Sequence, residues 1–296
     1  MSSSGRSGFV SLVGRPNSGK STLINTLVGE KISIVTDKPQ TTRNVVRGIV
    51  TRPEGQVVFL DTPGIHKPIH RMNERMMNAV RNSFSDVDIV SLIVDSSASF
   101  GGGDEFTLEL IKSLGKPKLL LLNKIDKVKK EDLLPQIDRY SRSLNFEEVI
   151  PISAKTGENV ETFLKALFRF LPAGPRFYSD DQFSDRSERT MASEIIREKV
   201  ILSTRDELPY STAVVIDRFE ESEKIYRIYA TIFVERESQK AILIGKGGLQ
   251  MKQIGTAARI ELESFFGRKV FLELHAKVSK GWRDDESRLS GFGLAD

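Results

Sequence analysis

The sequence contains no cysteine, only one tryptophan and no long apolar segment. Without cysteine, the chain cannot form a disulfide scaffold, a thiolate metal site or a cysteine nucleophile. No stretch reaches the roughly 18 uninterrupted apolar residues that a membrane-spanning helix requires, and no long apolar run follows the first five residues. We therefore expect a soluble, cytoplasmic protein.

The remaining composition is ordinary for a globular chain. Its 296 residues predict about two domains, and 39% apolar residues suffice for ordinary cores. The formal net charge of +4 is modest and by itself identifies no partner. The functional prediction therefore depends on local motifs.

The clearest motif is a phosphate-binding loop. Residues 14–21 read GRPNSGKS and fit G-x-x-x-x-G-K-[ST], between a strand-like segment at 9–13 and a helix-like segment that starts at Thr22. The alternative, a glycine-rich turn of chance composition, explains neither flanking segment. We expect backbone N–H groups to cradle phosphates, with Gly14 and Gly19 leaving room for close approach. The predicted nucleotide-binding residues of this loop are Gly14, Arg15, Pro16, Asn17, Ser18, Gly19, Lys20, Ser21 and Thr22.

A candidate metal-binding carboxylate follows the third strand-like segment. Segments 45–51 and 56–60 are separated by a turn signal at 52–55, and the second ends in Asp61, Thr62, Pro63 and Gly64. An aspartate at this position is suited to hold Mg²⁺ directly or through water, together with the Ser21 hydroxyl. We expect Lys20 to reach the β and γ phosphates and the Gly64 N–H to meet the γ phosphate.

Strands and helices alternate through the rest of the first half. We predict a helix at 72–84, a strand at 87–94, a glycine loop at 101–103, a helix at 105–114 and a strand at 118–122, then another helix and strand. This order predicts an α/β fold with a doubly wound parallel sheet.

Two short motifs predict selectivity for guanine. Asp126 can accept two hydrogen bonds from guanine N1 and N2, which adenine cannot supply, so an ATP-dependent enzyme is disfavoured. We expect Asn123 to tie the base loop to the phosphate loop, the Lys124 stem to lie over the base, and the Ala154 N–H to donate to guanine O6. The predicted base-binding residues are Asn123, Lys124, Asp126, Ser153, Ala154 and Lys155.

With these motifs, residues 8 to about 172 resemble a translation-factor-class GTPase domain, and the run Gln40-Thr41-Thr42-Arg43 is similar to the Era and TrmE group. The resemblance implies that Thr41 or Thr42, with Thr42 favoured, closes onto Mg²⁺ in the GTP state. The implied metal ligands are thus Ser21, Asp61, Thr42 and Thr41. The residues expected to act in hydrolysis are Lys20, Thr42 and Gly64.

One position departs from the Ras pattern. Ile65 stands where Ras-like proteins carry the glutamine that orients water, so water must be positioned otherwise and intrinsic hydrolysis should be slow. His66 is a candidate base, but a solvated loop residue is the favoured interpretation. Similarity to potassium-activated GTPases implies that Asn17 helps to hold K⁺.

The second half predicts an RNA-binding module. Breakers at 171–175 place a boundary there, giving domains 1–175 and 176–296. A helix at 190–202, strands at 211–219 and 224–235, a short apolar segment, the loop Gly245-Lys246-Gly247-Gly248, a helix and a strand at 269–278 follow. This order resembles an α+β KH domain of the prokaryotic type (type II), whose G-x-x-G loop clamps single-stranded RNA.

Positive charge gathers around this loop. Residues 239–283 hold nine Lys or Arg against three Glu, although residues 176–296 together carry a net −1. The alternative is a solvated charged face with an ordinary glycine turn. We expect Trp282 to lie in a core rather than to stack on a base. The predicted RNA-binding residues are Gly245, Lys246, Gly247, Gly248, Lys252, Lys240, Lys277 and Lys280.

One GTPase domain followed by one KH domain resembles the Era family. The single phosphate loop excludes the double-GTPase Der family, and the lack of cysteine disfavours TrmE. The resemblance implies GTP/GDP and Mg²⁺ as ligands, binding to the 3′ end of 16S ribosomal RNA, and a role in 30S subunit assembly. It also implies a monomer with peripheral inner-membrane contact. The alternative is a GTP-dependent switch whose second domain binds a protein or the membrane surface.

Overall fold

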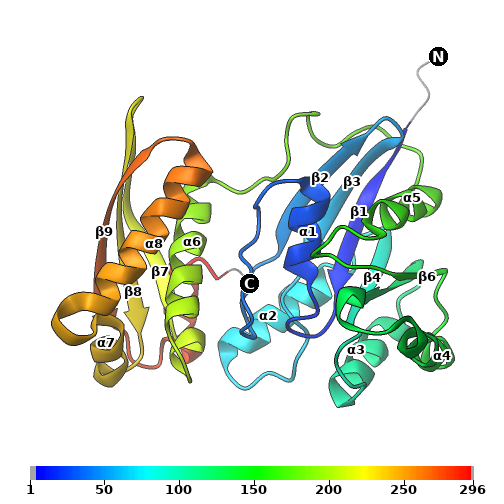
Figure 1. Cartoon of the computed structure of the whole chain (residues 1–296), viewed down its shortest axis with the longest axis horizontal. Coiled ribbons are helices and arrows are strands. Elements are labelled where there is room, and N and C mark those ends of the chain that lie inside the picture. The colour runs from blue at the N-terminus through cyan, green and yellow to red at the C-terminus, as the bar shows by residue number, and fades with distance from the viewer. Residues whose placement is uncertain (1–4, 295–296) are drawn as a thin grey trace. The chain divides into compact units, whose positions relative to one another are not determined.

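The computed structural model describes residues 5–294, which form two compact units. The first unit contains residues up to 35, 42–68 and 73–185. The second contains 36–41, 69–72 and the described residues from 186 onward. Each unit is described here by itself (Figure 1).

A six-stranded sheet forms the centre of the first unit, in the order β2-β3-β1-β4-β5-β6. All neighbouring strands are parallel except β2 and β3, which are antiparallel. The strands are β1 (Arg6–Val13), β2 (Val46–Arg52), β3 (Gly55–Asp61), β4 (Ile89–Asp95), β5 (Lys118–Asn123) and β6 (Glu148–Pro151). The doubly wound α/β prediction is therefore confirmed, with one antiparallel edge strand that alternation alone did not predict.

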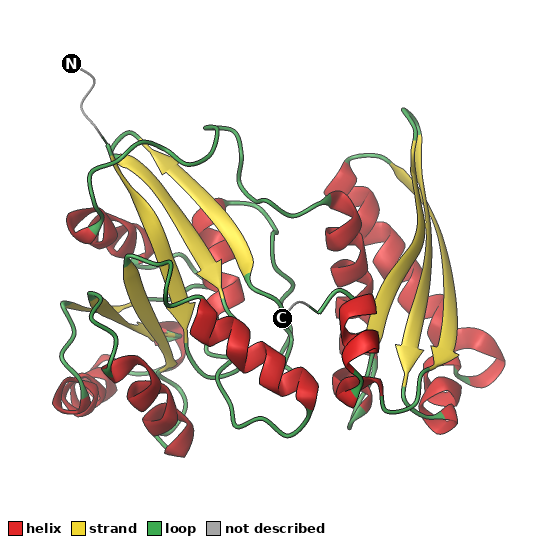
Figure 2. Ribbon diagram, turned by 180° about the vertical axis from the view of Figure 1, so that it is seen from behind, coloured by secondary structure: helices red, strands yellow, loops and turns green. Residues whose placement is uncertain are grey.

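Helices cover both faces of this sheet (Figures 1 and 2). They are α1 (Lys20–Val28), α2 (Arg71–Asn82), α3 (Gly102–Lys112), α4 (Leu133–Ser143) and α5 (Val160–Phe170). One core contains α1 and α5 side chains with Val10 and Phe59, and the other contains side chains of α2, α3 and α4 with Leu92 and Leu120. Successive side chains of a strand point alternately into the two cores. Because both faces of the sheet are buried, its strands are nearly continuous apolar runs.

Among the boundaries that differ from the sequence prediction, two have a cause that the structure shows. Helix α3 begins at Gly102, inside the predicted glycine loop, because the Asp104 carboxylate accepts a hydrogen bond from the Gly101 N–H at 2.9 Å and caps the helix. The first unit continues to Asp185, ten residues beyond the expected boundary at 175. The last segment of the first unit runs beside β2, where the Ile49 N–H donates to the Phe183 carbonyl at 3.0 Å.

The second unit contains a three-stranded sheet in the order β7-β8-β9, with β7 and β8 antiparallel and β8 and β9 parallel. Its elements are α6 (Glu188–Ser203), β7 (Ala213–Glu221), β8 (Ile225–Val234), α7 (Glu237–Ile244), α8 (Leu249–Phe266), β9 (Lys269–Val278) and α9 (Glu286–Gly291). Helices α6 and α8 lie on one face of the sheet (Figure 2), and their apolar side chains form one core with it. The predicted order of elements is confirmed.

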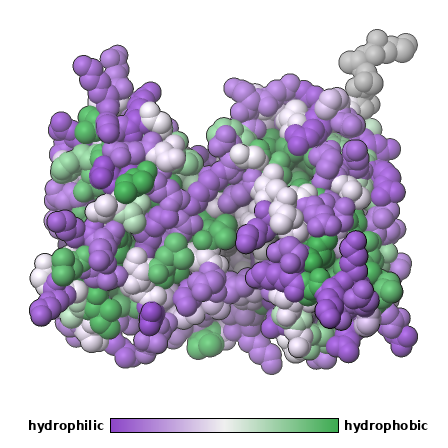
Figure 3. Space-filling model, in the orientation of Figure 1, coloured by the Kyte–Doolittle hydropathy of each residue, from purple (hydrophilic) through white to green (hydrophobic). Residues whose placement is uncertain are grey.

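The surface shown in Figure 3 is mostly hydrophilic, and its apolar side chains form small separate groups. Among the helices that the structure describes, none combines the length and the hydropathy needed to cross a bilayer. Trp282 is fully buried, and its indole N–H donates to the Ser211 carbonyl at 3.1 Å, so its predicted core position is confirmed.

Candidate functional site

The phosphate loop connects β1 to α1 and packs tightly against two neighbouring strands. A Cβ atom on Gly14 would lie 2.3 Å from the Ile93 carbonyl oxygen of β4, and one on Gly19 would lie 2.2 Å from the Asn123 side-chain amide. Both positions also have positive φ values, 157° and 101°. Glycine is thus required at both positions by contact with protein atoms, whereas the sequence prediction gave room for phosphate as the reason.

Lys20 is held at the centre of this loop. Its ammonium donates to the carbonyls of Gly14 and Arg15, both at 3.1 Å, and the residue is only 5% exposed. Burial lowers the pKa of Lys20 to about 8, although the nearby Asp61 carboxylate acts in the opposite direction. An anion beside this ammonium would stabilise its charged form, so the site is electrostatically suited to a phosphate group.

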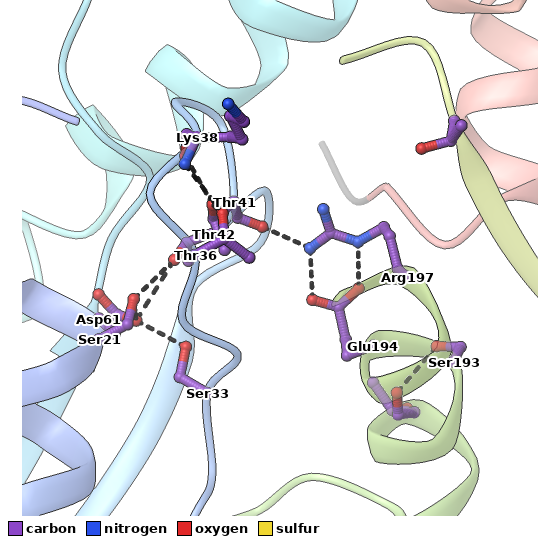
Figure 4. Close-up of polar contacts among 12 residues, drawn as sticks. Ser21, Ser33, Thr36, Lys38, Thr41, Thr42, Asp61, Ser193, Glu194 and Arg197 are labelled. Carbon is purple, nitrogen blue, oxygen red and sulfur yellow. Dashed lines mark hydrogen bonds and ion pairs between the residues drawn. The ribbon is translucent and has the colours of Figure 1, made fainter. Parts of the chain in front are cut away.

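The oxygen-bearing side chains of Ser21, Thr42 and Asp61 meet next to the start of α1 (Figure 4). The Ser21 hydroxyl donates to an Asp61 carboxylate oxygen at 2.7 Å and lies 2.9 Å from the Thr42 hydroxyl. Thr42 lies 3.5 Å from the same carboxylate oxygen, and Asp61 is fully buried. Hydroxyl and carboxylate oxygens are the ligands that Mg²⁺ prefers, so this donor set fits the predicted metal. Ser33, absent from the sequence prediction, also donates to Asp61, at 2.9 Å.

The structure distinguishes the two adjacent threonines. The Thr41 hydroxyl donates to the Lys38 carbonyl at 2.7 Å and lies 2.6 Å from the Thr36 hydroxyl, so it is occupied within its own segment (Figure 4). Only the Thr42 hydroxyl joins Ser21 and Asp61. Of the two threonines, Thr42 has the position suited to a metal ligand.

The backbone beside Thr42 is bound within the second unit, to which residues 36–41 belong. Arg197 of α6 donates a hydrogen bond from Nη2 to the Thr41 carbonyl (Figure 4). The guanidinium also pairs with Glu194, with Nε and Nη2 at 2.9 and 2.6 Å from its carboxylate oxygens. Arg197 is 3% exposed, so this arrangement is shielded from solvent. Nothing in the sequence pattern indicated this contact.

The base-binding motifs are joined as predicted, with one exception. The Asn123 side-chain amide donates to the Ser18 carbonyl at 2.8 Å, which confirms the tie between the base loop and the phosphate loop. The Ser153 hydroxyl donates to Asp126 at 2.6 Å and fixes that carboxylate. The Ala154 N–H, however, donates to Asn123 Oδ1 at 2.9 Å, so it is not held solely for guanine.

Asp95 is a further polar residue of this region. The Lys124 ammonium lies 2.6 Å from its carboxylate, and Lys124 itself has a left-handed φ of 67°. Burial acts to raise the pKa of Asp95, but hydrogen bonds from Lys124 and Ser97 outweigh it and lower the pKa overall. This ion pair fixes the position of the Lys124 side chain, which belongs to the base loop. The sequence contained a signal for this residue, because Asp95 directly follows the strand predicted at 87–94. In the structure, Asp95 ends β4 opposite Asn123 of β5.

In the second unit, the loop at 245–248 connects α7 to α8. Gly245, Gly247 and Gly248 have φ values of 71°, 59° and 78°, a region that favours glycine. A Cβ on Gly247 or Gly248 would meet no atom within 4 Å, so this backbone is open to an approaching ligand. Gly248 also precedes the 18-residue helix α8, whose first N–H groups attract anions.

The lysines predicted to bind RNA, and two apolar side chains next to the loop in sequence, are at least partly exposed. Lys246, Lys252, Lys277 and Lys280 are exposed, and Lys240 is partly exposed. Ile242 and Leu249 flank the loop and are 60% and 61% exposed. Sequence reasoning did not assign these two residues a contact role, although exposed apolar side chains beside a basic loop suit the faces of unstacked bases.

Comparisons with known proteins find matches in both units of the chain. A family model described as 50S ribosome-binding GTPase matches residues 9–124, and a KH domain model matches residues 207–283. The GTPase Era of Staphylococcus haemolyticus (strain JCSC1435) is 48% identical over 292 residues, which span 98% of this chain and 98% of that protein.

Two solved structures resemble the whole chain. A variant of Aquifex aeolicus Era bound to GDP and AlF4⁻ is 37% identical, with a TM-score of 0.94, and the match covers 98% of this chain and 100% of that one. Era in complex with MgGDPNP and nucleotides 1506–1542 of 16S ribosomal RNA is 38% identical, with a TM-score of 0.94, covering 99% and 100%. The chain therefore belongs to the Era family of GTPases.

Proposed function

We propose that this GTPase binds the 3′ end of 16S ribosomal RNA through the loop at 245–248 and acts in assembly of the 30S subunit. The observation that carries the proposal is the open, left-handed backbone of Gly247 and Gly248, flanked by exposed lysines. The Era complex with nucleotides 1506–1542 of 16S ribosomal RNA, similar over nearly the whole chain, supports the choice of RNA. The KH domain match supports single-stranded recognition.

At the nucleotide site, we propose that Ser21, Thr42 and Asp61 hold Mg²⁺, with Asp61 binding it directly or through water. Their oxygens already converge within 3.5 Å. The metal would supply positive charge to the β and γ phosphate oxygens, where negative charge develops during hydrolysis. Lys20 would contribute a second positive charge, and the phosphate loop would hold the nucleotide through its backbone N–H groups.

We propose that the nucleotide state sets the affinity for RNA. Thr42 belongs to the metal site, and the preceding residue, Thr41, is bound by Arg197 of the RNA-binding unit. Residues 69–72, which follow the Gly64 loop, also group with that unit, where the Arg71 N–H donates to Asp284 at 3.0 Å. Movement of residues 41–42 on GTP binding would thus act on α6. To move nearly all molecules from one state to the other, GTP must bind the favoured state more tightly than the other state by about 5 kcal/mol.

We also propose that K⁺ accelerates hydrolysis through Asn17. Its left-handed φ of 63° places this side chain at a sharp bend of the phosphate loop. Hydrolysis should then run faster in KCl than in NaCl at equal ionic strength, and Asn17→Ala should remove the difference. Equal rates in both salts for the unsubstituted protein would exclude the proposal.

The alternative function is a GTP-dependent switch whose second unit binds a protein or the membrane surface. Filter binding of an RNA fragment with the 16S 3′ sequence, across a series of salt concentrations, separates the two. We expect tight binding that weakens steeply with salt. For single strands, the logarithm of the binding constant falls with the logarithm of the salt concentration with a slope of about −0.7 per neutralised phosphate. Peripheral membrane contact, a cytoplasmic location and a monomeric state remain predictions.

Gly247→Asp tests the loop directly. It adds a negative charge where no atom lies within 4 Å, so repulsion of phosphate should weaken RNA binding at least tenfold. Gly267→Asp is the matched control, because Gly267 has a similar φ of 65°, equally open surroundings and a position at the other end of α8. Unchanged affinity in Gly247→Asp would favour the protein or membrane alternative.

A further inference from the structure

The loop that follows Asp61 is fixed against the phosphate loop by its backbone. A Cβ on Gly64 would lie 2.7 Å from Pro16 Cα, and the Ile65 N–H donates to the Gly14 carbonyl at 3.0 Å. Residues 64 and 65 therefore contact the segment that is suited to hold the phosphates. Any side chain anchored to this short backbone stretch is kept close to that segment.

Ile65 is turned away from this region. Its side chain is 1% exposed and belongs to the core that contains Val13, Leu60 and Met77. An isoleucine cannot form a hydrogen bond with water, and here its side chain is also packed inside the protein. Orientation of the attacking water must therefore come from another group.

His66 is the next residue, and it is partly exposed. Its Nδ1 lies 2.7 Å from the Gly64 carbonyl oxygen. A carbonyl can only accept, so Nδ1 carries the proton in this hydrogen bond, and in the neutral ring Nε2 then presents a lone pair. The Nε2 atom is buried and has no hydrogen-bond partner among the described residues.

We propose that His66 orients the water that attacks the γ phosphate. The Gly64 carbonyl fixes the ring tautomer, and Nε2 accepts a hydrogen bond from that water in the GTP state. The water oxygen forms a bond to the γ phosphorus while the bond from this phosphorus to the β–γ bridging oxygen breaks. The bond's electron pair remains on the bridging oxygen of GDP, and the water proton ends on inorganic phosphate. His66 takes up no net proton.

The geometry favours His66 over other neighbouring side chains. Its acceptor atom is shielded from bulk solvent, where a hydrogen bond to a single water is stronger than at an exposed site. The ring is held by a backbone carbonyl of the same loop that contacts Pro16, so few torsions remain to be fixed when substrate binds. His70, the nearest other histidine, instead pairs with Asp284 at 3.1 Å.

Single-turnover hydrolysis of GTP by the full-length protein tests this inference, with His66→Ala, His66→Gln and the control His70→Ala. We expect His66→Ala to lower the rate at least tenfold while the Kd for GTP stays within twofold. Its affinity for GDP with AlF4⁻, which mimics the transition state, should fall by a similar factor. His66→Gln, whose amide oxygen can accept from water, should recover most of the rate. His70→Ala should hydrolyse GTP at the unsubstituted rate.

The outcomes separate this inference from the GTPase assignment on which it rests. If the unsubstituted protein does not hydrolyse GTP, the assignment itself fails. If it does, and His66→Ala hydrolyses GTP equally fast, only the role of His66 is wrong. An equal loss of GTP and GDP affinity in His66→Ala, without rescue by His66→Gln, would show a purely structural role and also overturn the inference.

Discussion

Hydrogen bonds within the protein fix several side chains of the nucleotide site. Lys20 is buried with a pKa of about 8, and its ammonium donates to the backbone carbonyls of Gly14 and Arg15. Ser153 fixes the Asp126 carboxylate, and Asn123 joins the two loops. Because hydrogen bonds within the protein fix these groups, little side-chain ordering should oppose nucleotide binding.

Binding of nucleotide should therefore be linked to proton uptake by Lys20. At pH 9 the ammonium is mostly deprotonated in the free protein, since its pKa of about 8 lies below the ordinary 10.5, and phosphate should restore its charge. Calorimetric titration with GDP in two buffers of different ionisation enthalpy should reveal uptake of nearly one proton at pH 9 and much less at pH 7. Identical enthalpies in both buffers at pH 9 would contradict this account.

The same shift affects stability without nucleotide. Because the folded pKa lies below the unfolded value, burial of charged Lys20 opposes folding below about pH 8, and this penalty is relieved as the pH rises towards 10.5. The contribution of Lys20 to the free energy of unfolding thus increases over that window.

Asp126→Asn tests the guanine pocket. The amide cannot accept both base N–H groups, but it can donate to the extra carbonyl of xanthine, so preference should move from GTP toward XTP. We expect at least a tenfold loss of GTP affinity, measured by competition against a fluorescent nucleotide. Asp132→Asn, an exposed acidic residue in the following segment, serves as a control and should bind GTP normally. Retained GTP preference in Asp126→Asn would show that the base is read elsewhere.

At the scale of elements, Trp282 anchors the segment after β9 to the second unit. It is fully buried, bonds to Ser211 and packs edge-on against Phe292 with centroids 5.3 Å apart. Trp282→Phe should lower the free energy of unfolding by about 1–3 kcal/mol, because it leaves a cavity and an unpaired carbonyl. Urea unfolding followed by circular dichroism measures this, and Phe271→Leu at an exposed site should change stability by less than about 1 kcal/mol.

The sequence predicted elements and motifs better than contacts between distant segments. The phosphate loop, Asp61, Asn123 and the loop at 245–248 could be found because short spacings fix them locally. Strands β2 and β3 are antiparallel because a tight turn between Arg52 and Gly55 joins them. The sequence indicated this turn, and such a turn also determines the direction of the second strand.

Other features had no local signal. The segment after residue 175 joins the first unit because Gln56 accepts hydrogen bonds from the N–H groups of Phe177 and Tyr178, at 2.9 and 3.0 Å. The Thr41–Arg197 contact spans 156 residues of sequence. Hydrogen bonds between such distant residues depend on the folded arrangement, so composition and periodicity do not predict them.

At the scale of the whole molecule, the chain combines a GTPase unit with a KH unit, whose loop at 245–248 we propose to bind RNA. The link proposed between them consists of residues 36–41, which directly precede Thr42 of the proposed metal site and group with α6 in the second unit. Since coupling between two ligands is reciprocal, RNA must raise the affinity for GTP by the same factor by which GTP raises the affinity for RNA.

The most direct test of this account is the Kd of the 16S 3′ fragment for the protein without nucleotide, with GDP and with a non-hydrolysable GTP analogue, at one fixed salt concentration. We predict at least fivefold tighter RNA binding with the GTP analogue than with GDP, a coupling of about 1 kcal/mol or more. The same Kd in all three states would contradict the central claim that the nucleotide controls RNA binding.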